Sequence, residues 1–313
     1  MEDKVEDKTK QCIKIAKMYY EEDLGQKEIA DELNISRPTV SRQLQYAREM
    51  GIVEVTIHDP YDKSEELVRL IKEKYGLKDV LIKEVTSDRY ETVIKAISES
   101  AAEYLARTVK NNDVVGVSWG QTMYHVAEQM PQTNLHGVET IQLKGGISYS
   151  NVATNSHETL SLFAQSFNSI PRDLPVPVIF DNKEVKKLVS ADRHIKGILN
   201  MAPKCNVAIY TTGTVRDEAL LFKLGFFNKD EMKRLKMNAV GDICSRFYNE
   251  KGKTADAFVD DRTMGVTLST LRKIPTSILV AGGQHKVEAI RGALNGNIPN
   301  VLITDSITAK QLI

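Results

Sequence analysis

The sequence has little of what would place a protein in a membrane or outside the cell. No apolar run among its 313 residues approaches the roughly 20 residues that cross a bilayer. The first residues, Met1-Glu2-Asp3-Lys4, are charged, whereas a secretion signal needs a basic start and then an apolar stretch, so we expect no export. The three cysteines, Cys12, Cys205 and Cys244, are far apart, which argues against a disulfide framework or a metal-ligand cluster. We therefore expect a cytoplasmic protein without metal or cofactor, whose cysteines pack as small apolar side chains.

A surplus of charge is missing as well. Lys and Arg number 42, Asp and Glu also number 42, and the formal net charge is zero. Residues 1–60 are acidic, with nine basic side chains against thirteen acidic ones. Nucleic-acid binders normally carry a basic surface that neutralises phosphates. The balanced charge excludes a protein that is basic over its whole surface. Residues 34–48, however, contain three arginines and no acid, so a local basic face remains possible.

Short helices are predicted at the start of the chain. Apolar positions recur at helical spacing over residues 13–20, 26–33 and 37–49. Ser36 can cap the third helix, Pro38 is tolerated in its first turn, and Gly51 suits its end. Two helices joined by a three-residue turn indicate a helix-turn-helix.

An alternating run over residues 52–57 predicts a strand after these helices. A strand in that place describes a winged form of the motif. The length of the chain and its 42% hydrophobic and 27% charged residues suit a small folded domain plus a larger one. We expect the helix-turn-helix domain to span residues 1–58.

The last of the three helices would enter the major groove of DNA. Arg and Gln can donate paired hydrogen bonds to guanine and adenine, whereas Ser and Thr suit phosphates. The predicted DNA contacts are the polar residues on the face opposite Val40 and Leu44, namely Ser36, Arg37, Thr39, Ser41, Arg42 and Gln45. The alternative is an ordinary helical hairpin with a solvated polar face. The lack of acids on that face and the following strand favour DNA binding.

The remaining chain, residues 59–313, alternates between helix and strand patterns after a linker at residues 59–64. Helices are predicted over residues 67–75, 90–109, 121–130 and 156–167. Strands are predicted over residues 79–82, 113–118, 138–143, 176–180, 207–211, 277–281 and 301–304. This order predicts an α/β domain with a doubly wound, mostly parallel sheet covered on both faces. Ligands of such sheets bind at the carboxyl ends of the strands.

Four of these strand ends carry glycines together with polar side chains. They are residues 118–122, 143–146, 212–215 and 281–286. Glycine permits close backbone approach, and a helix that begins there offers free amide groups to an anion. One such turn often serves only packing, but four of them, with hydroxyls and lysines, indicate a site for a small anionic molecule.

These segments resemble the SorC family of bacterial transcriptional regulators over essentially the whole chain. The matching motifs are residues 26–45, 115–122, 241–243 and 281–286. Within the family the chain is most similar to the Bacillus-type deoxyribonucleoside regulators, through residues 142–148, 180–182, 213–219 and 240–247.

The resemblance implies an effector domain shaped like sugar-phosphate isomerases and glucosamine-phosphate deaminases, in a tetrameric repressor, and we expect a homo-oligomer between a dimer and a tetramer. It also implies deoxyribose 5-phosphate as inducer, with Lys144 forming a reversible Schiff base beside Gly145 and Gly146. A lysine attacks a carbonyl only when neutral, which burial favours. A solvated lysine, or one that contacts phosphate by charge alone, is the alternative for Lys144.

The phosphate site of the family maps onto Gly120, Gln121, Thr122 and Lys286, and Thr214 and Asp242 match positions near the sugar. Gln121 stands where the family pattern has a second Thr, which puts the contacts there in doubt. The leading hypothesis is a repressor that releases its operator when it binds a phosphorylated sugar. The alternatives are a sugar-phosphate isomerase or aldolase with a DNA-binding domain, and a DNA-binding architectural protein without effector. The helix-turn-helix argues against an enzyme.

Overall fold

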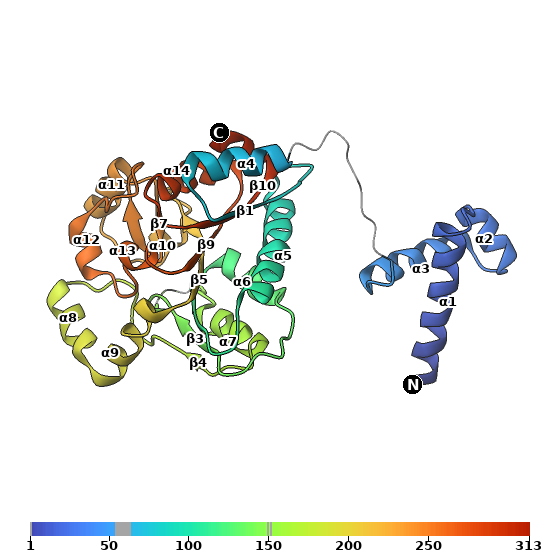
Figure 1. Ribbon diagram of the computed structural model, residues 1–313, viewed down its shortest axis with the longest axis horizontal. Helices are drawn as coiled ribbons and strands as arrows, with labels where there is room; N and C mark the ends of the chain where they lie inside the picture. The colour runs from blue at the N-terminus through green and yellow to red at the C-terminus, as the bar shows by residue number, and fades with distance from the viewer. Residues whose placement is uncertain (1, 54–63, 149, 151) are drawn as a thin grey trace. The chain divides into compact units, whose positions relative to one another are not determined.

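The computed structural model describes residues 2–53, 64–148, 150 and 152–313. The chain divides into two compact units, Met1–Asp62 and Lys63–Ile313, and each is described by itself (Figure 1). The expected domain boundary between residues 58 and 59 lies outside the described residues.

The first unit contains the three predicted helices. They are α1 (Glu2–Tyr20), α2 (Gln26–Glu32) and α3 (Arg37–Glu49). Their apolar faces meet in one core, formed by Cys12, Ile15, Ala16, Met18, Ile29, Ala30, Val40, Leu44 and Ala47. The small Ala30 side chain is part of this core, as expected where α2 and α3 pack closely. The predicted helix-turn-helix is thereby confirmed.

Both ends of α3 follow from its sequence. The Ser36 hydroxyl oxygen accepts a hydrogen bond from the Thr39 backbone N–H, at 3.3 Å, and Pro38 lies in the first turn. At the other end Gly51 has φ +66°, and the backbone N–H of Ile52 donates to the Ala47 carbonyl at 2.9 Å. This is a Schellman-type helix end. The predicted strand over residues 52–57 lies mostly outside the described residues.

The second unit is built on a seven-stranded sheet in the order β1-β10-β9-β5-β2-β3-β4, with every pair parallel. A separate three-stranded sheet, β6-β7-β8, is antiparallel. The strands of the large sheet are β1 (Asp79–Lys83), β2 (Val114–Val117), β3 (Glu139–Gln142), β4 (Pro171–Arg172), β5 (Val207–Tyr210), β9 (Thr276–Val280) and β10 (Val301–Asp305). Those of the small sheet are β6 (Thr212–Gly213), β7 (Gly241–Ile243) and β8 (Arg246–Tyr248).

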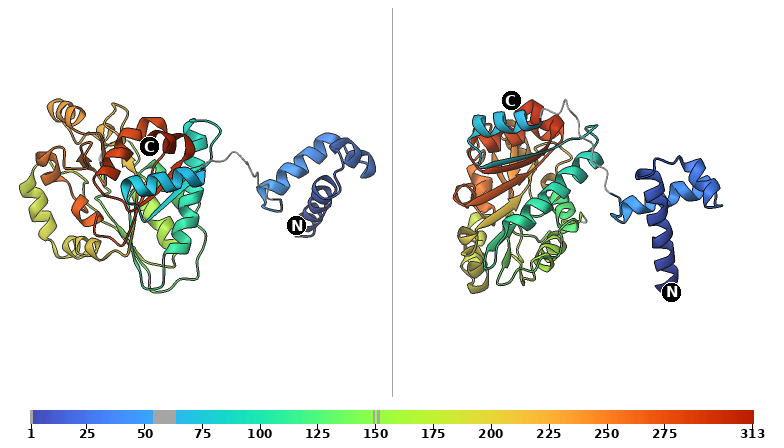
Figure 2. Two further views of the ribbon diagram at one scale, coloured as in Figure 1. Left: turned by 45° about the horizontal axis from the view of Figure 1, so that its top comes forward. Right: turned by 45° about the vertical axis from the view of Figure 1, so that its right-hand side comes forward.

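Helices cover both faces of the large sheet (Figure 2). The longer helices of the second unit, not all of which contact this sheet, are α4 (Ser64–Tyr75), α5 (Tyr90–Thr108), α6 (Gln121–Glu128), α7 (Ser156–Ser166), α8 (Lys183–Ala191), α11 (Lys229–Asn238) and α14 (Val287–Asn295). The shorter ones are α9 (Arg193–Leu199), η1 (Ala202–Lys204), α10 (Leu220–Lys223), α12 (Ala257–Arg262), α13 (Leu268–Leu271), η2 (Gln284–Lys286) and α15 (Ser306–Leu312).

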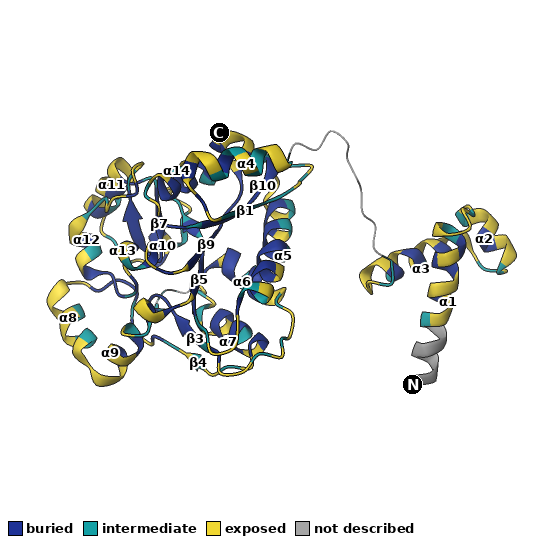
Figure 3. Cartoon of the chain, in the orientation of Figure 1, coloured by how far each residue is buried: buried dark blue, intermediate teal, exposed yellow. Residues whose placement is uncertain are grey.

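Alternate side chains of each central strand point to opposite faces of the sheet. In β9, Ile278 and Val280 pack with residues of α5, α6 and α7, whereas Leu279 packs with α4, α13, α14 and α15. Figure 3 shows the strands buried between the two helical layers. Two-sided burial explains why these strands are almost entirely apolar. The predicted doubly wound sheet is confirmed.

The order of the strands creates one switch point. From β2 the chain proceeds outward through β3 to β4, and from β5 it proceeds the other way through β9 to β10. The strands β2 and β5 are neighbours, so the loops after them leave in opposite directions. A crevice forms where loops diverge in this way.

The strand predicted over residues 176–180 is wrong. Only single bridges occur there, from Pro177 to Ile147 and from Ile179 to Thr263. Pro175 and Pro177 lack the N–H that a ladder requires. The apolar side chains are buried for another reason: Val178 and Ile179 join one apolar cluster and Val176 and Phe180 join another. The edge strand that extends the sheet is β4.

Candidate functional site

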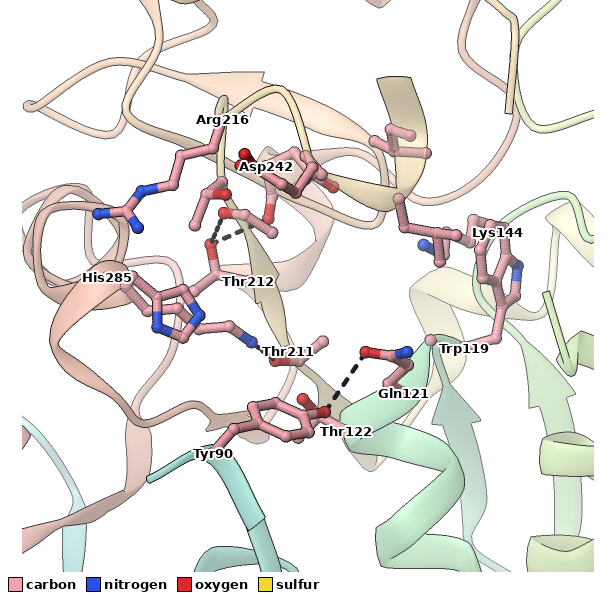
Figure 4. Close-up of a pocket in the computed structure, with 18 residues that line it drawn as sticks. Tyr90, Trp119, Gln121, Thr122, Lys144, Thr211, Thr212, Arg216, Asp242 and His285 are labelled. Carbon is pink, nitrogen blue, oxygen red and sulfur yellow. Dashed lines mark hydrogen bonds between the residues drawn. The ribbon is translucent and has the colours of Figure 1, made fainter. Parts of the chain in front are cut away.

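A cavity of about 500 Å³ opens at the carboxyl ends of β2, β3, β5 and β9, at the switch point. Its volume is that of pockets for small molecules. Figure 4 shows its polar side chains converging from loops that are far apart in the sequence. It is lined by Tyr90, Trp119, Gly120, Gln121, Thr122, Lys144, Thr211, Thr212, Gly213, Thr214, Arg216, Glu218, Ala219, Leu220, Leu221, Asp242, His285 and Lys286.

Seven of the nine effector-site residues predicted from sequence line this cavity: Gly120, Gln121, Thr122, Lys144, Thr214, Asp242 and Lys286. Gly145 and Gly146 do not. A Cβ on Gly145 would lie 2.6 Å from the carbonyl oxygens of Val176 and Pro177, and one on Gly146 would collide with Gln142 and Ser156. These two glycines therefore allow the loop after β3 to pack closely.

One end of the cavity suits an anion. Helix α6 begins at Gln121 with no acidic residue in its first turn, and its N-cap Gly120 has φ +131°, a conformation that other residues rarely adopt. The free amides of such a helix start attract negative charge. Gln121 is oriented by Tyr90 of α5, whose hydroxyl donates to its Oε1 at 3.4 Å (Figure 4). This contact uses only the side-chain oxygen of Gln121, so the two N–H donors of its amide group take no part in it.

A cation faces the same end. Lys286 Nζ donates to the Thr211 hydroxyl at 3.4 Å. Burial lowers the pKa of Lys286 to about 8, although the Asp242 carboxylate opposes the shift. Burial holds the pKa of His285 below its usual value, and the positive charges of Lys286 and Arg216 act in the same direction. Near neutral pH the cavity therefore offers positive charge from Lys286 and from the Arg216 guanidinium, which also lines it.

The other end holds a buried amine. Lys144 is 6% exposed, and its Nζ lies 3.6 Å from the centre of the Trp119 ring (Figure 4) and 3.5 Å from the Ser245 hydroxyl oxygen. Burial lowers the pKa of Lys144, with Asp242 acting in the opposite direction. A lowered pKa raises the neutral fraction of the amine, which is the form that attacks carbonyls.

Asp242 also lines the cavity, and its carboxyl group interacts electrostatically with both Lys144 and Lys286. Burial raises the pKa of this carboxyl group, while Lys144, the Ser245 backbone N–H and Lys286 oppose the shift. The Ser245 N–H donates to Asp242 Oδ2 at 3.0 Å. Gly213 faces the carboxyl group across the β6–β7 pair, and a Cβ there would collide with it. The glycine is therefore needed for the carboxyl group to reach the cavity.

Several lining residues were missed by the sequence prediction. Trp119 and Thr212 lie inside two of the glycine-containing strand ends, residues 118–122 and 212–215, but neither was predicted as a contact, and Thr211 directly precedes the second of these segments. Tyr90 had no signal, because it begins α5, which follows β1 at the far edge of the sheet. Arg216 and His285 flank predicted residues and could have been found as charged neighbours.

The residues predicted to contact DNA lie along α3 and its cap. Ser36, Arg37, Ser41, Arg42 and Gln45 are exposed, and Thr39 is half-buried. The predicted acid-free face is interrupted at its end, since the Gln45 amide donates to Glu49 Oε1 at 2.8 Å. The prediction considered residues 34–48 and stopped one residue before this carboxylate. Arg42 Nε donates to the Pro38 carbonyl at 3.3 Å, which keeps its guanidinium close to the helix start.

Comparison with known proteins identifies both units. Residues 59–313 match the family model described as "Putative sugar-binding domain", and residues 3–49 match the one described as "Sigma-70, region 4". The deoxyribonucleoside regulator of Bacillus subtilis is 50% identical over 307 residues, which covers 98% of each chain. The chain belongs to the SorC family of transcriptional regulators.

Other SorC-family proteins support this assignment. The sorbitol operon regulator of Klebsiella pneumoniae is 31% identical over 306 residues, which covers 96% of each chain. The crystal structure of the full-length sorbitol operon regulator SorC from that organism superposes with a TM-score of 0.79, at 30% identity, and covers 97% of this chain and 98% of that one. Because these relatives are named regulators, the SorC-family chain is a transcriptional regulator with a sugar-binding domain and not an enzyme.

No helix in the part of the chain that the structure describes is long and apolar enough to cross a lipid bilayer. Among the same described residues, His, Cys, Asp and Glu side chains form no group of three or more that could hold a metal ion.

Proposed function

We propose that this regulator represses transcription by binding operator DNA, and that a phosphorylated sugar in the cavity relieves the repression. Residues 1–58 would read the DNA and residues 59–313 would bind the sugar and hold the subunits together. The observation that carries the proposal is the polarity of the cavity. A buried amine of lowered pKa lies at one end, and a helix start with Lys286 lies at the other. A ligand with a carbonyl at one end and a phosphate at the other fits both.

Deoxyribose 5-phosphate is the ligand that we propose. It has an aldehyde in its open form and a phosphate four carbons away. The 50% identical relative is named for deoxyribonucleosides, which contain this sugar. Lys144 would attack the aldehyde and form a reversible Schiff base, because its lowered pKa supplies the neutral amine. The noncovalent alternative, in which Lys144 contacts the ligand by charge alone, predicts no covalent adduct.

The remaining contacts follow from the placement of the lining residues. Gly120, Gln121, Thr122 and Lys286 would bind the phosphate, and Thr214 and Asp242 would contact the sugar. We assign Gly145 and Gly146 no contact with the ligand, since both are closed off by neighbouring atoms.

In the first unit, Arg37, Arg42 and Gln45 would contact bases or nearby phosphates, and Ser36, Thr39 and Ser41 would contact phosphates. One such helix offers a small basic face, so two or more copies are needed for tight binding. We therefore propose a dimer or tetramer that acts in the cytoplasm, where the DNA lies.

Two measurements test the proposal. Gel-shift titration should show operator DNA released as deoxyribose 5-phosphate is added, and unchanged DNA binding at saturating ligand would contradict the induction. Borohydride treatment of the mixture should add the mass of the reduced sugar at Lys144. Lys144→Met should prevent the adduct, whereas Lys251→Met, an exposed lysine in another turn, should not. Ligand-dependent release without an adduct would leave the repressor in place and reject the Schiff base.

A further inference from the structure

The tip of the β7–β8 hairpin has an unusual backbone. Ile243 pairs with Arg246, so the loop consists of Cys244 and Ser245 alone. Their φ angles are +49° and +64°. A two-residue loop with both φ angles positive is a type I′ turn, for which Asn-Gly is preferred. Cys and Ser are poorly suited to this conformation, and such outliers persist mainly where the surroundings enforce them for a function.

Arg246 enforces this turn. Its guanidinium donates to the carbonyls of Val266 at 3.1 Å, Thr263 at 3.0 Å and Gly265 at 3.2 Å, and it pairs with Asp260 at 2.9 Å. The hairpin is thus fastened to residues 260–266.

The same segment holds Lys144. The Val266 N–H donates to the Leu143 carbonyl at 2.8 Å, and Lys144 forms a bridge with Gly265. A Cβ on Gly265 would lie 2.7 Å from the Lys144 Cα, so only glycine allows this approach. Residues 265–266 therefore contact the hairpin, through Arg246, and also the backbone at Lys144. They fix the position of Ser245 relative to Lys144.

The result is a hydroxyl group aimed at the amine. Ser245 is fully buried, and its Oγ lies 3.5 Å from Lys144 Nζ. Its backbone N–H donates to Asp242 Oδ2 at 3.0 Å, so one residue joins the amine to the carboxyl group. We propose that the Cys244–Ser245 turn holds the Ser245 hydroxyl as a proton relay for the reversible imine at Lys144. This inference rests on the proposed function, because it requires the Schiff base.

Imine formation includes proton transfers that such a relay would speed. When the neutral amine attacks the aldehyde carbon, the nitrogen must lose a proton and the carbonyl oxygen must gain one. Ser245 takes the proton from nitrogen and passes its own to the oxygen, which gives the neutral carbinolamine. Asp242 in its acid form then protonates the hydroxyl, water leaves, and the nitrogen lone pair forms the iminium. The carboxylate that remains balances its charge, and the reverse sequence hydrolyses it.

A relay changes rates in both directions and leaves the equilibrium unchanged, which distinguishes it from a structural role. We would mix the full-length protein with deoxyribose 5-phosphate, quench with borohydride at intervals, and measure the adduct by mass spectrometry. Hydrolysis would be followed by diluting the preformed imine before the quench. Ser245→Ala should slow both rates by at least tenfold and leave the extent of adduct at equilibrium within twofold. Affinity for 2-deoxyribitol 5-phosphate, which lacks the carbonyl, should also stay within twofold.

Two further variants keep the result interpretable. Ser245→Gly also lacks the hydroxyl but suits the positive φ, so it should be slow even if Ser245→Ala folds poorly. Ser98→Ala is the matched control, because Ser98 is equally buried on α5 and its hydroxyl has no hydrogen-bond partner among the described residues. It should react like the wild type. Adduct in all proteins with wild-type rates in both Ser245 variants would overturn the relay alone. No adduct in the wild type would overturn both the relay and the proposed Schiff base.

Discussion

Two lysines line the ligand cavity, and their surroundings suit them to different chemistry. Burial lowers the pKa of both, and Asp242 opposes the shift in both. Lys144 lies against the Trp119 ring and the Ser245 hydroxyl, and its neutral form would act as a nucleophile. Lys286 lies beside the Thr211 hydroxyl and near the start of α6, and its charged form would bind phosphate. A lowered pKa therefore favours the nucleophilic form of Lys144, and it sets an upper pH limit for phosphate binding by Lys286.

The limit at Lys286 gives a prediction for ligand affinity. Its pKa is about 8 in the free protein, so above that pH the amine loses the proton that attracts phosphate. A bound phosphate raises this pKa, and the affinity must then fall as the pH rises through 8. We expect affinity for 2-deoxyribitol 5-phosphate, measured by calorimetry, to fall by about tenfold between pH 7.5 and 9. The reduced ligand is used because it cannot react with Lys144.

Two substitutions assign this pH dependence to Lys286. In Lys286→Arg the guanidinium stays charged throughout the range, so the affinity should be nearly constant with pH. In Lys286→Met the affinity should be low at every pH. The assignment would be wrong if Lys286→Arg kept the slope of the wild type.

Glu49 gives a prediction for the DNA-binding helix. Its carboxylate accepts from the Gln45 amide at the exposed end of α3, and it would repel nearby DNA phosphates. Glu49→Gln removes the charge and retains an acceptor for Gln45. We expect operator affinity in gel-shift titrations to rise by about threefold at low salt, with a smaller gain at high salt. Glu22→Gln, outside α3, should change the affinity less, and equal gains in both variants would show a general effect of net charge.

At the level of the helix, glycine has opposite effects in two places. Gly76 follows α4 with φ +64°, and Gly197 lies inside the short helix α9. A Cβ at either position meets no atom within 4 Å, so packing does not affect the comparison. Gly76→Ala should lower the free energy of unfolding by about 1–2 kcal/mol, since an L-residue is strained there. Gly197→Ala should raise it by about 0.5–1 kcal/mol, because alanine favours helix.

Urea unfolding followed by Trp119 fluorescence measures this for the second unit. Trp119 is the single tryptophan of the chain and is buried in that unit. The wild type and the two variants should share one m-value, so that shifts in midpoint report stability. A shift of the same sign in both variants would contradict the assigned backbone conformations.

The helices and strands that position the site could largely be predicted from sequence. Buried strands such as β2 and β9 are almost entirely apolar and end in glycine turns, and parallel strands bring their carboxyl ends to one edge. This reasoning located Lys144, Asp242 and Lys286 on one cavity from loops more than 40 residues apart in the sequence. It could not show which glycines face the ligand, because Gly145 and Gly146 have the same local pattern as Gly120.

The rest of the site depends on tertiary structure that leaves no local signal. Tyr90 reaches the cavity only because α5 packs on β1, β9 and β10 beside α6, which depends on the order of the strands. The Cys244–Ser245 turn lacks the Asn or Gly that marks a type I′ turn, so the local sequence does not predict it. Hydrogen bonds of Arg246 and Asp242 hold the turn instead. The strand expected at residues 176–180 was wrong because two apolar clusters imitate the pattern of a buried strand.

Charge limits how strongly the whole molecule can attract DNA. Its net charge is zero and its first 60 residues are acidic, so long-range attraction to DNA is weak. The basic face is limited to three arginines of α3, next to the acid Glu49. On the proposed DNA contacts each copy would neutralise few phosphates, so tight binding would require linking several copies. This is why we place subunit association in the second unit, where the ligand can change how the copies are arranged.

A ligand that controls DNA binding through the arrangement of subunits is itself controlled by DNA. If deoxyribose 5-phosphate lowers operator affinity by a factor, operator DNA must lower the affinity for the sugar phosphate by the same factor at equilibrium. We expect this factor to be roughly 5–150, the usual range of such coupling. Ligand affinity would be measured by equilibrium dialysis with and without saturating operator, and DNA affinity by gel shift with and without saturating ligand. A scrambled duplex is the control and should leave ligand affinity unchanged at moderate salt. Unequal factors would mean that the two ligands do not act on one shared equilibrium, and that release of DNA has another cause, such as direct competition for the same surface.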